Sequence, residues 1–133
     1  MKKNLIVLHA LSKKPTDEWY QSIANEGIAR GFESFVPSLP SSFKPNLKKT
    51  YGFISRSFQL NSRTTLIGHS SGATLILGML QMLPMKVIVN RVILIGCPID
   101  PFLTDELHKH VPRRDYANLF PLAWDWEKIK RSA

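Results

Sequence analysis

The sequence predicts an α/β domain with an open, mainly parallel sheet and helices on both faces. Two observations predict it. The first is a set of four short apolar runs with the branched residues typical of buried strands. The second is that these runs alternate with segments of helical length and pattern. This alternation gives βαβ units with right-handed crossovers. With 133 residues, 44% hydrophobic and 21% charged, we expect one globular domain over residues 1–133. The strands are expected at 5–8, 33–36, 63–67 and 91–96.

The helices are predicted from apolar spacing. The first is capped by Thr16 or Asp17, ends near Gly31 and carries one apolar side made of Trp19, Tyr20, Ile23, Ala24 and Ile28. The second spans 45–59, with a stripe of Leu47, Tyr51, Ile54 and Phe58. The third, 71–83, is apolar nearly all round and should be buried. We interpret three methionines in and just after this helix as core filler: Met79, Met82 and Met85. A fourth helical segment covers 123–130.

Composition and charge narrow the classes of function. The formal net charge is +8, but the basic residues are scattered and no nucleic-acid-binding motif surrounds them. The N-terminal apolar run is too short for a signal peptide, and Pro84, Lys86 and Arg91 divide the longest apolar region. We therefore expect no nucleic-acid partner, no membrane span and a cytoplasmic location.

The single Cys97 fits a reducing compartment and a buried structural role. Nothing in the sequence indicates a metal or cofactor.

The sharpest motif is Gly68-His69-Ser70-Ser71-Gly72, a G-x-S-x-G pattern that follows a predicted strand and opens a predicted helix. This context is typical of a nucleophile elbow, in which a strained turn lifts the serine hydroxyl above the sheet. Gly68 and Gly72 would allow the strand and helix to approach closely. Ser70 is then the nucleophile, and the Ser71 N–H faces a developing oxyanion. His69 is interpreted as packing, not as the base.

Two alternatives stay open at this point. Ser70 could simply cap the helix, since serine is a favoured capping residue. Four aromatic residues have two interpretations, the lining of an apolar acyl pocket or ordinary core packing: Trp19, Phe120, Trp124 and Trp126.

The chain resembles the small α/β-hydrolase-like serine hydrolases typified by YdeN and the retinoblastoma-binding-protein hydrolase. The matching residues include the strand and loop at 5–11, Trp19-Tyr20, Pro37-Ser38-Leu39-Pro40 and the elbow. Phe120 and the run Trp124-Asp125-Trp126-Glu127-Lys128-Ile129-Lys130 are similar to a lid segment of that family, so 98–130 is expected to form a lid-like excursion. The L-x-C-x-E motif is absent, and that partner is not carried over.

The resemblance implies a sheet in which the first and third strands are neighbours, with the second strand outside the first and the fourth outside the third. The ligand site would lie at the switch in winding direction between the two inner strands. The family pattern also implies that the loop at Ala10 or Leu11 supplies the second oxyanion-hole N–H.

The family's triad order is Ser, Asp, His, with the last two on loops after later strands. This chain ends at Ala133, so the expected fold is incomplete at its C-terminal end. After Ser70 the only histidines are His108 and His110, preceded by Asp100 and Asp105. Their closeness in sequence argues against a triad, and an exposed polar loop explains them better. A serine without its base is a poor nucleophile, and activity is expected to be weak or absent.

Three hypotheses of function follow. The first is a serine hydrolase that cleaves a small ester or amide through an acyl-Ser70 intermediate. The second is a non-catalytic binding module derived from a hydrolase, and the third is a nucleic-acid-binding domain. Independently, the fourth strand, 91–96, is expected to be an apolar edge through which the chain forms a homo-oligomer.

Overall fold

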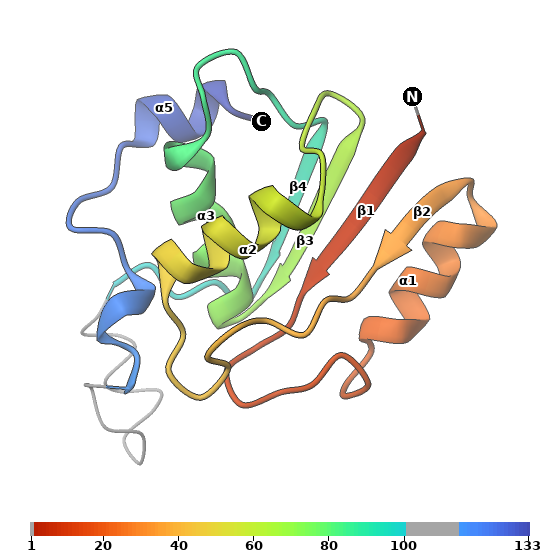
Figure 1. The fold of residues 1–133 in the computed structure, drawn as a ribbon, viewed down its shortest axis with the longest axis horizontal. Helices are drawn as coiled ribbons and strands as arrows, with labels where there is room; N and C mark the ends of the chain where they lie inside the picture. Colours follow the sequence, from red (N-terminus) through yellow and green to blue (C-terminus); the bar gives the residue numbers. More distant parts are fainter. Residues whose placement is uncertain (1, 101–114) are drawn as a thin grey trace.

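The computed structural model describes residues 2–100 and 115–133. Within them the chain forms one four-stranded parallel sheet of order β2-β1-β3-β4 (Figure 1). The strands are β1 (Lys3–Leu8), β2 (Phe32–Phe35), β3 (Thr64–His69) and β4 (Arg91–Ile95). The helices are α1 (Tyr20–Ala29), α2 (Leu47–Ser57), α3 (Ser71–Met82), the short 3-10 helix η2 (Ala117–Leu119) and α5 (Trp126–Arg131). The predicted fold class and strand order are confirmed.

The register brings the carboxyl ends of β1 and β3 together. Leu8 at the end of β1 pairs with Gly68 of β3, and His69 pairs with Ile95 of β4. The chain winds outward in opposite directions from β1 and β3, so the switch point lies between them, at the edge to which all four strands point (Figure 1). Both chain termini lie toward the other end of the sheet.

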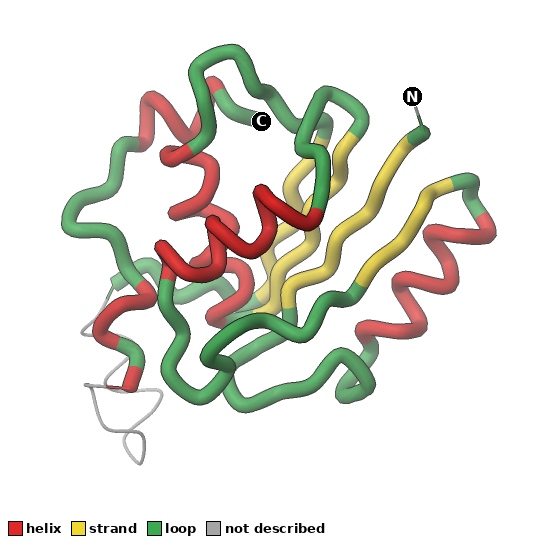
Figure 2. The backbone as a smooth tube through the Cα atoms, viewed as in Figure 1, coloured by secondary structure: helices red, strands yellow, loops and turns green. Residues whose placement is uncertain are grey.

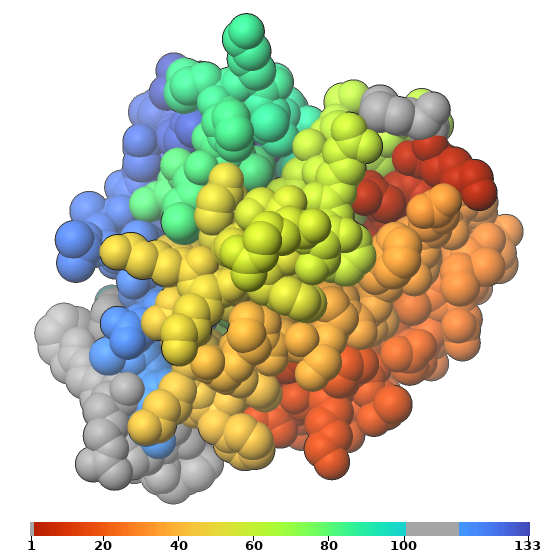
Figure 3. All heavy atoms as spheres, viewed as in Figure 1, coloured from red at the N-terminus to blue at the C-terminus, as the bar shows by residue number. Residues whose placement is uncertain are grey.

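The two faces of the sheet have separate cores, because successive side chains of a strand point to opposite sides. On one face Leu5, Val7 and Ile67 pack with Tyr20 of α1. On the other face lies the larger cluster, which includes Ile6, Leu8, Leu66, Ile54 of α2 and most of α3. Figure 2 shows helices on both sides of the strands, and Figure 3 shows the outer surface of α2 and its flanking loops.

The α1 cap was predicted wrongly. The helix begins after Trp19, which makes no side-chain cap hydrogen bond. Asp17 instead accepts a hydrogen bond from the backbone N–H of Lys14 at 2.8 Å, closing a turn before the helix. The apolar side of the helix is also only partly covered, since Ile28 is 58% exposed while Tyr20 is fully buried.

The core role expected for the methionines holds for only part of the set. Met79 on α3 is fully buried, and Met82 packs against the core at partial exposure. Met85 is 69% exposed, because α3 ends at Met82 and the chain turns away at Pro84. Cys97 is partly buried beside the large core, and burial raises the pKa of its thiol, as expected of a structural cysteine.

The second half of the predicted excursion, 98–130, is described from residue 115 onward. It holds η2 and α5, whose N-cap Asp125 accepts a hydrogen bond from the Lys128 N–H at 3.0 Å. Asp105, His108 and His110 lie outside the described residues. No helix of the described part is long and apolar enough to cross a membrane.

Candidate active site

Ser70 lies at the junction of β3 and α3 in a backbone conformation that side chains rarely adopt. Its φ is 53° and its ψ is −117°, an arrangement that costs about 1–3 kcal/mol in a non-glycine residue. The surrounding chain holds it there: the Ser70 N–H donates to the Ile95 carbonyl at 2.8 Å, and the Ser70 carbonyl accepts from Ala73 N–H at 3.0 Å. The elbow is therefore tied both to β4 and to the first turn of α3.

The two elbow glycines are required by close packing. A Cβ on Gly68 would lie 2.6 Å from the Ala73 Cα atom. A Cβ on Gly72 would collide with the Leu8 carbonyl oxygen and lie 2.7 Å from the His9 carbonyl oxygen. Neither position admits a side chain without a shift of backbone, since the neighbouring atoms belong to the main chain. The glycines thus allow α3 to start directly against the ends of β1 and β3.

Ser70 occupies the N-cap position of α3, yet its side chain makes no cap hydrogen bond. The Ser70 side chain therefore does not cap α3, and this alternative from the sequence is not supported. Ser70 is partly exposed, and Ser71, the first residue of α3, is buried. The first N–H groups of a helix lack carbonyl partners within it and lie at the positive end of its dipole. The Ser71 N–H is of this kind.

The loop after β1 approaches the same point. Gly72 packs against the carbonyls of Leu8 and His9, which places Ala10 and Leu11 beside the start of α3. Ala10, Leu11 and Ser71 line one common hollow of about 10 Å³, room for about one water molecule. The three residues predicted for the oxyanion hole thus lie near one another, and Ser70 is not among the residues that line this hollow.

One of the N–H groups predicted for the oxyanion hole already has a hydrogen-bond partner. The Ala10 N–H donates to the Tyr20 hydroxyl at 2.9 Å, and the same hydroxyl lies 2.8 Å from His69 Nδ1. Burial raises the pKa of Tyr20, so the hydroxyl keeps its proton. Tyr20 thus joins the loop after β1 to the elbow, and the Leu11 N–H is the better candidate for the second oxyanion donor.

His9 is held as a neutral imidazole beneath this loop. Its side chain is only 2% exposed. The Leu39 N–H donates to Nε2 at 2.9 Å, so Nε2 must be an acceptor and Nδ1 carries the proton that faces the Ala10 carbonyl at 3.0 Å. Desolvation lowers the pKa of His9. Both ring nitrogens are used for structure, and His9 is not placed to act as a base.

The four aromatic residues fall into two groups. Trp19 lies beside the elbow, with ring centroids 5.0 Å from Tyr20 and 5.5 Å from His69. Phe120 and Trp124 pack against the large core at partial exposure. Trp124 donates its indole N–H to the Ile99 carbonyl at 3.0 Å and stacks on Trp126, which is 42% exposed. The structure does not gather these aromatic rings around one described hollow.

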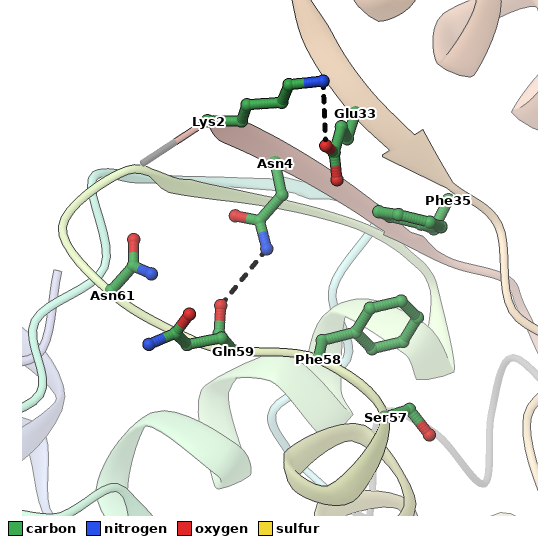
Figure 4. A pocket seen from close by; sticks show the side chains of 8 residues that line it. All are labelled: Lys2, Asn4, Glu33, Phe35, Ser57, Phe58, Gln59 and Asn61. Carbon is green, nitrogen blue, oxygen red and sulfur yellow. Dashed lines mark hydrogen bonds and ion pairs between the residues drawn. The ribbon is translucent and has the colours of Figure 1, made fainter.

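The two larger hollows lie away from Ser70. The one in Figure 4 holds about 360 Å³ and lies over the amino half of β1, beside β2 and the turn after α2. Lys2 and Glu33 form an ion pair of 3.4 Å at its rim, and Asn4 donates to the Gln59 carbonyl at 3.2 Å. The other, about 340 Å³, lies on the α1 side of β3 and β4. Neither includes an elbow residue.

Sequence reasoning missed the structural roles of His9 and of the Tyr20 hydroxyl. Apolar periodicity placed Tyr20 on the buried side of α1 and says nothing about its oxygen. The general signal was present, since a buried tyrosine hydroxyl normally needs a polar partner. His9 follows a buried strand and offered a similar hint. Its partner Leu39 is thirty residues away, beyond the reach of any local pattern.

Comparison with solved structures shows an α/β-hydrolase-type fold. The ydeN gene product from B. subtilis superposes with a TM-score of 0.83 at 21% identity, over 98% of this chain and 67% of its own. Polyneuridine aldehyde esterase gives a TM-score of 0.58 at 13% identity, over 84% of this chain and 49% of its own. A PytH variant gives a TM-score of 0.56 at 18% identity, over 73% of this chain and 41% of its own. This chain thus spans two thirds of the first of these proteins and less than half of the other two.

No family model matches the sequence. No curated protein matches it either. The likeness therefore rests on three-dimensional structure, and at these identities it defines the fold.

Proposed function

We propose that this chain carries the nucleophile of a serine hydrolase, one that cleaves a small ester or amide through an acyl-Ser70 intermediate. The observation that carries the proposal is the backbone of Ser70, strained at φ 53° and ψ −117° with its side chain free of any cap hydrogen bond. Strain of this kind is retained where function requires it. Here it presents a hydroxyl at the switch point of an open α/β sheet, where ligands of such folds bind.

The surrounding groups support acyl transfer. A tetrahedral intermediate at Ser70 needs N–H donors for its oxyanion. The Ser71 N–H at the start of α3 would be one, and the Leu11 N–H the other, because the Ala10 N–H is taken by Tyr20. The esterase among the similar structures is consistent with this chemistry. An ordinary reducing, cytoplasmic setting suits the single cysteine.

A general base for Ser70 is not found among the described residues. Of the two histidines in that part of the chain, His9 has both nitrogens engaged and His69 is hydrogen-bonded to the Tyr20 hydroxyl through Nδ1. From the described residues alone we therefore expect weak turnover or none, since an alcohol without a base stays protonated. This observation favours a second candidate function, a binding module that keeps the site without turnover.

A fluorophosphonate probe with a fluorescent tag distinguishes the candidates. We expect slow labelling of the parent that is lost in Ser70→Ala and kept in the matched control Ser38→Ala, whose serine is exposed in a loop. Equal labelling of Ser70→Ala and the parent would show that Ser70 is not the nucleophile. If the parent does not label but p-nitrophenyl butyrate raises its melting temperature, and Ser70→Trp abolishes the rise, the binding module is supported.

A further inference from the structure

The face of the sheet that packs against α2 changes from apolar to polar along its strands. Ile6 and Leu8 of β1 are fully buried, whereas Asn4, earlier on the same face, is only partly buried. In the parallel register Asn4 pairs with Glu33, and Phe35 lies two positions further along β2, so both side chains are on this face too. In the described part of the chain no helix stands in front of the amino ends of β1 and β2 (Figure 1).

The hollow of about 360 Å³ lies over these amino ends and is bounded on its other side by the turn after α2 (Figure 4). Sites for small molecules have volumes of about 300–1,000 Å³. The hollow falls near the lower end of that range, so its occupant must be a small molecule. No elbow residue lines it, and a ligand here would bind independently of the chemistry of Ser70.

The charged groups of this hollow offset each other. Among the described residues that line it, Lys2 and Glu33 are the charged ones, and they form an ion pair with an N–O distance of 3.4 Å. An anionic ligand would meet the Glu33 carboxylate and a cationic ligand the Lys2 ammonium, each with repulsion between like charges. The hollow therefore favours a neutral ligand.

One side of the hollow is formed by a pair of aromatic rings. Phe35 and Phe58 have ring centroids 5.0 Å apart and ring planes inclined by 52°, and Figure 4 shows both rings on the same side of Asn4. Because the two rings contact each other in a tilted arrangement, they leave no slot between them for a flat aromatic ligand. Phe35 is 38% exposed, so its ring still offers an apolar surface to C–H groups.

The opposite side of the hollow carries amide side chains. Figure 4 shows Gln59 and Asn61 on the other side of Asn4 from the two rings. Within the described residues the hydrogen bonds of Gln59 use its backbone carbonyl, which accepts from Asn4 and Thr64, and leave its side-chain amide open. The Asn61 side chain accepts from the Arg63 N–H through Oδ1 at 2.8 Å, which leaves its NH₂ group open. An amide side chain offers both donors and an acceptor, the combination that a hydroxyl group can match.

We propose that this hollow binds a neutral monosaccharide in its pyranose form. Such a sugar ring has a face of C–H groups, which the Phe35 ring would cover, and hydroxyl groups that both donate and accept, which the amides of Gln59 and Asn61 would bind. Its lack of charge matches the paired Lys2 and Glu33. Since few groups make these contacts, the dissociation constant should be in the millimolar range.

An NMR titration of the ¹⁵N-labelled chain with methyl β-D-glucopyranoside and methyl β-D-galactopyranoside tests the site. At least one of the two sugars should give saturable amide shifts at residues 33–35 and 57–61, and none at the elbow, 68–72. Inorganic phosphate, an anion, and benzamide, a flat aromatic amide, should give no saturable shifts at these residues. The proposal is overturned if neither sugar saturates, or if phosphate or benzamide binds as well as the sugar.

Two variants connect the binding to the two sides of the hollow. Phe35→Ala removes the apolar surface and should weaken sugar affinity about tenfold. Its matched control is Phe43→Ala, at a phenylalanine that is 73% exposed and does not line the hollow, which should bind like the parent. Gln59→Ala removes an exposed side chain without a described hydrogen bond, so the fold should be kept while the affinity falls about fivefold. Unchanged affinity in either Phe35→Ala or Gln59→Ala would contradict the proposed site.

Discussion

The Tyr20 hydroxyl lies 2.8 Å from His69 Nδ1 while it accepts the Ala10 N–H at 2.9 Å. Two hydrogen bonds on one buried oxygen therefore connect α1, the loop after β1 and the elbow. The bridge engages one ring nitrogen of His69, the residue before Ser70. It also engages the N–H of Ala10, one of the two oxyanion-hole candidates in the loop after β1.

Removing this hydroxyl should destabilise the fold. Tyr20→Phe keeps the ring but leaves the Ala10 N–H and His69 Nδ1 without their partner, and a buried unpaired polar group costs about 1–3 kcal/mol. We expect a loss of that size in the free energy of unfolding, measured by urea titration. Tyr51→Phe, a change of the same atoms at a partly buried position on α2, should cost less than about 0.5 kcal/mol. Equal losses would argue against the bridge.

Two glycine substitutions should have opposite signs. Gly72→Ala forces a methyl group onto the Leu8 and His9 carbonyls, and overpacking of this kind costs about 1–3 kcal/mol or more. Gly52→Ala lies within α2, where the new Cβ meets only the flexible Arg56 side chain at 3.1 Å. Alanine within a helix is favoured over glycine by about 0.5–1 kcal/mol. Thermal melts should therefore fall for the first variant and rise for the second; a tolerated Gly72→Ala would mean that α3 is not packed so closely.

His9 should make stability depend on pH. Burial lowers the pKa of His9 in the folded state, so the unfolded chain binds more protons between that value and the ordinary value of about 6.5. The stabilising contribution is complete above pH 6.5 and is lost as the pH falls through the lowered folded-state pKa. His9→Gln, whose amide can still accept from Leu39 N–H but does not titrate, should flatten the decline between pH 7 and 5. An unchanged pH dependence in urea titrations of this variant would contradict the assignment.

Much of the fold could be predicted because it depends on local patterns. The apolar runs located all four strands, and the resemblance gave their order. The glycine spacing located the tight turn at Ser70. What failed depends on where each element begins and ends. The α1 cap was misplaced because Asp17 closes its own turn with Lys14, and Met85 is exposed because the chain leaves the core after α3.

The candidate site was predicted in part for the same reason. The tight turn at Ser70, its two glycines and the nearby loop after β1 follow from a motif and its flanking elements. The engagement of the Ala10 N–H could not be predicted, because the Tyr20 hydroxyl that accepts it comes from α1 and no local pattern marks that oxygen. The four aromatic residues could not be assigned from sequence, since both packing and pocket lining favour large apolar rings.

The most direct measurement for the central claim is the site of phosphonylation. After reaction of the parent with a fluorophosphonate, tryptic digestion should give a modified peptide spanning residues 64–86, and fragmentation should locate the adduct on Ser70. The adduct should be missing from Ser70→Ala and present in Ser38→Ala. Modification of another serine, or an adduct that persists in Ser70→Ala, would contradict the role proposed for the strained turn.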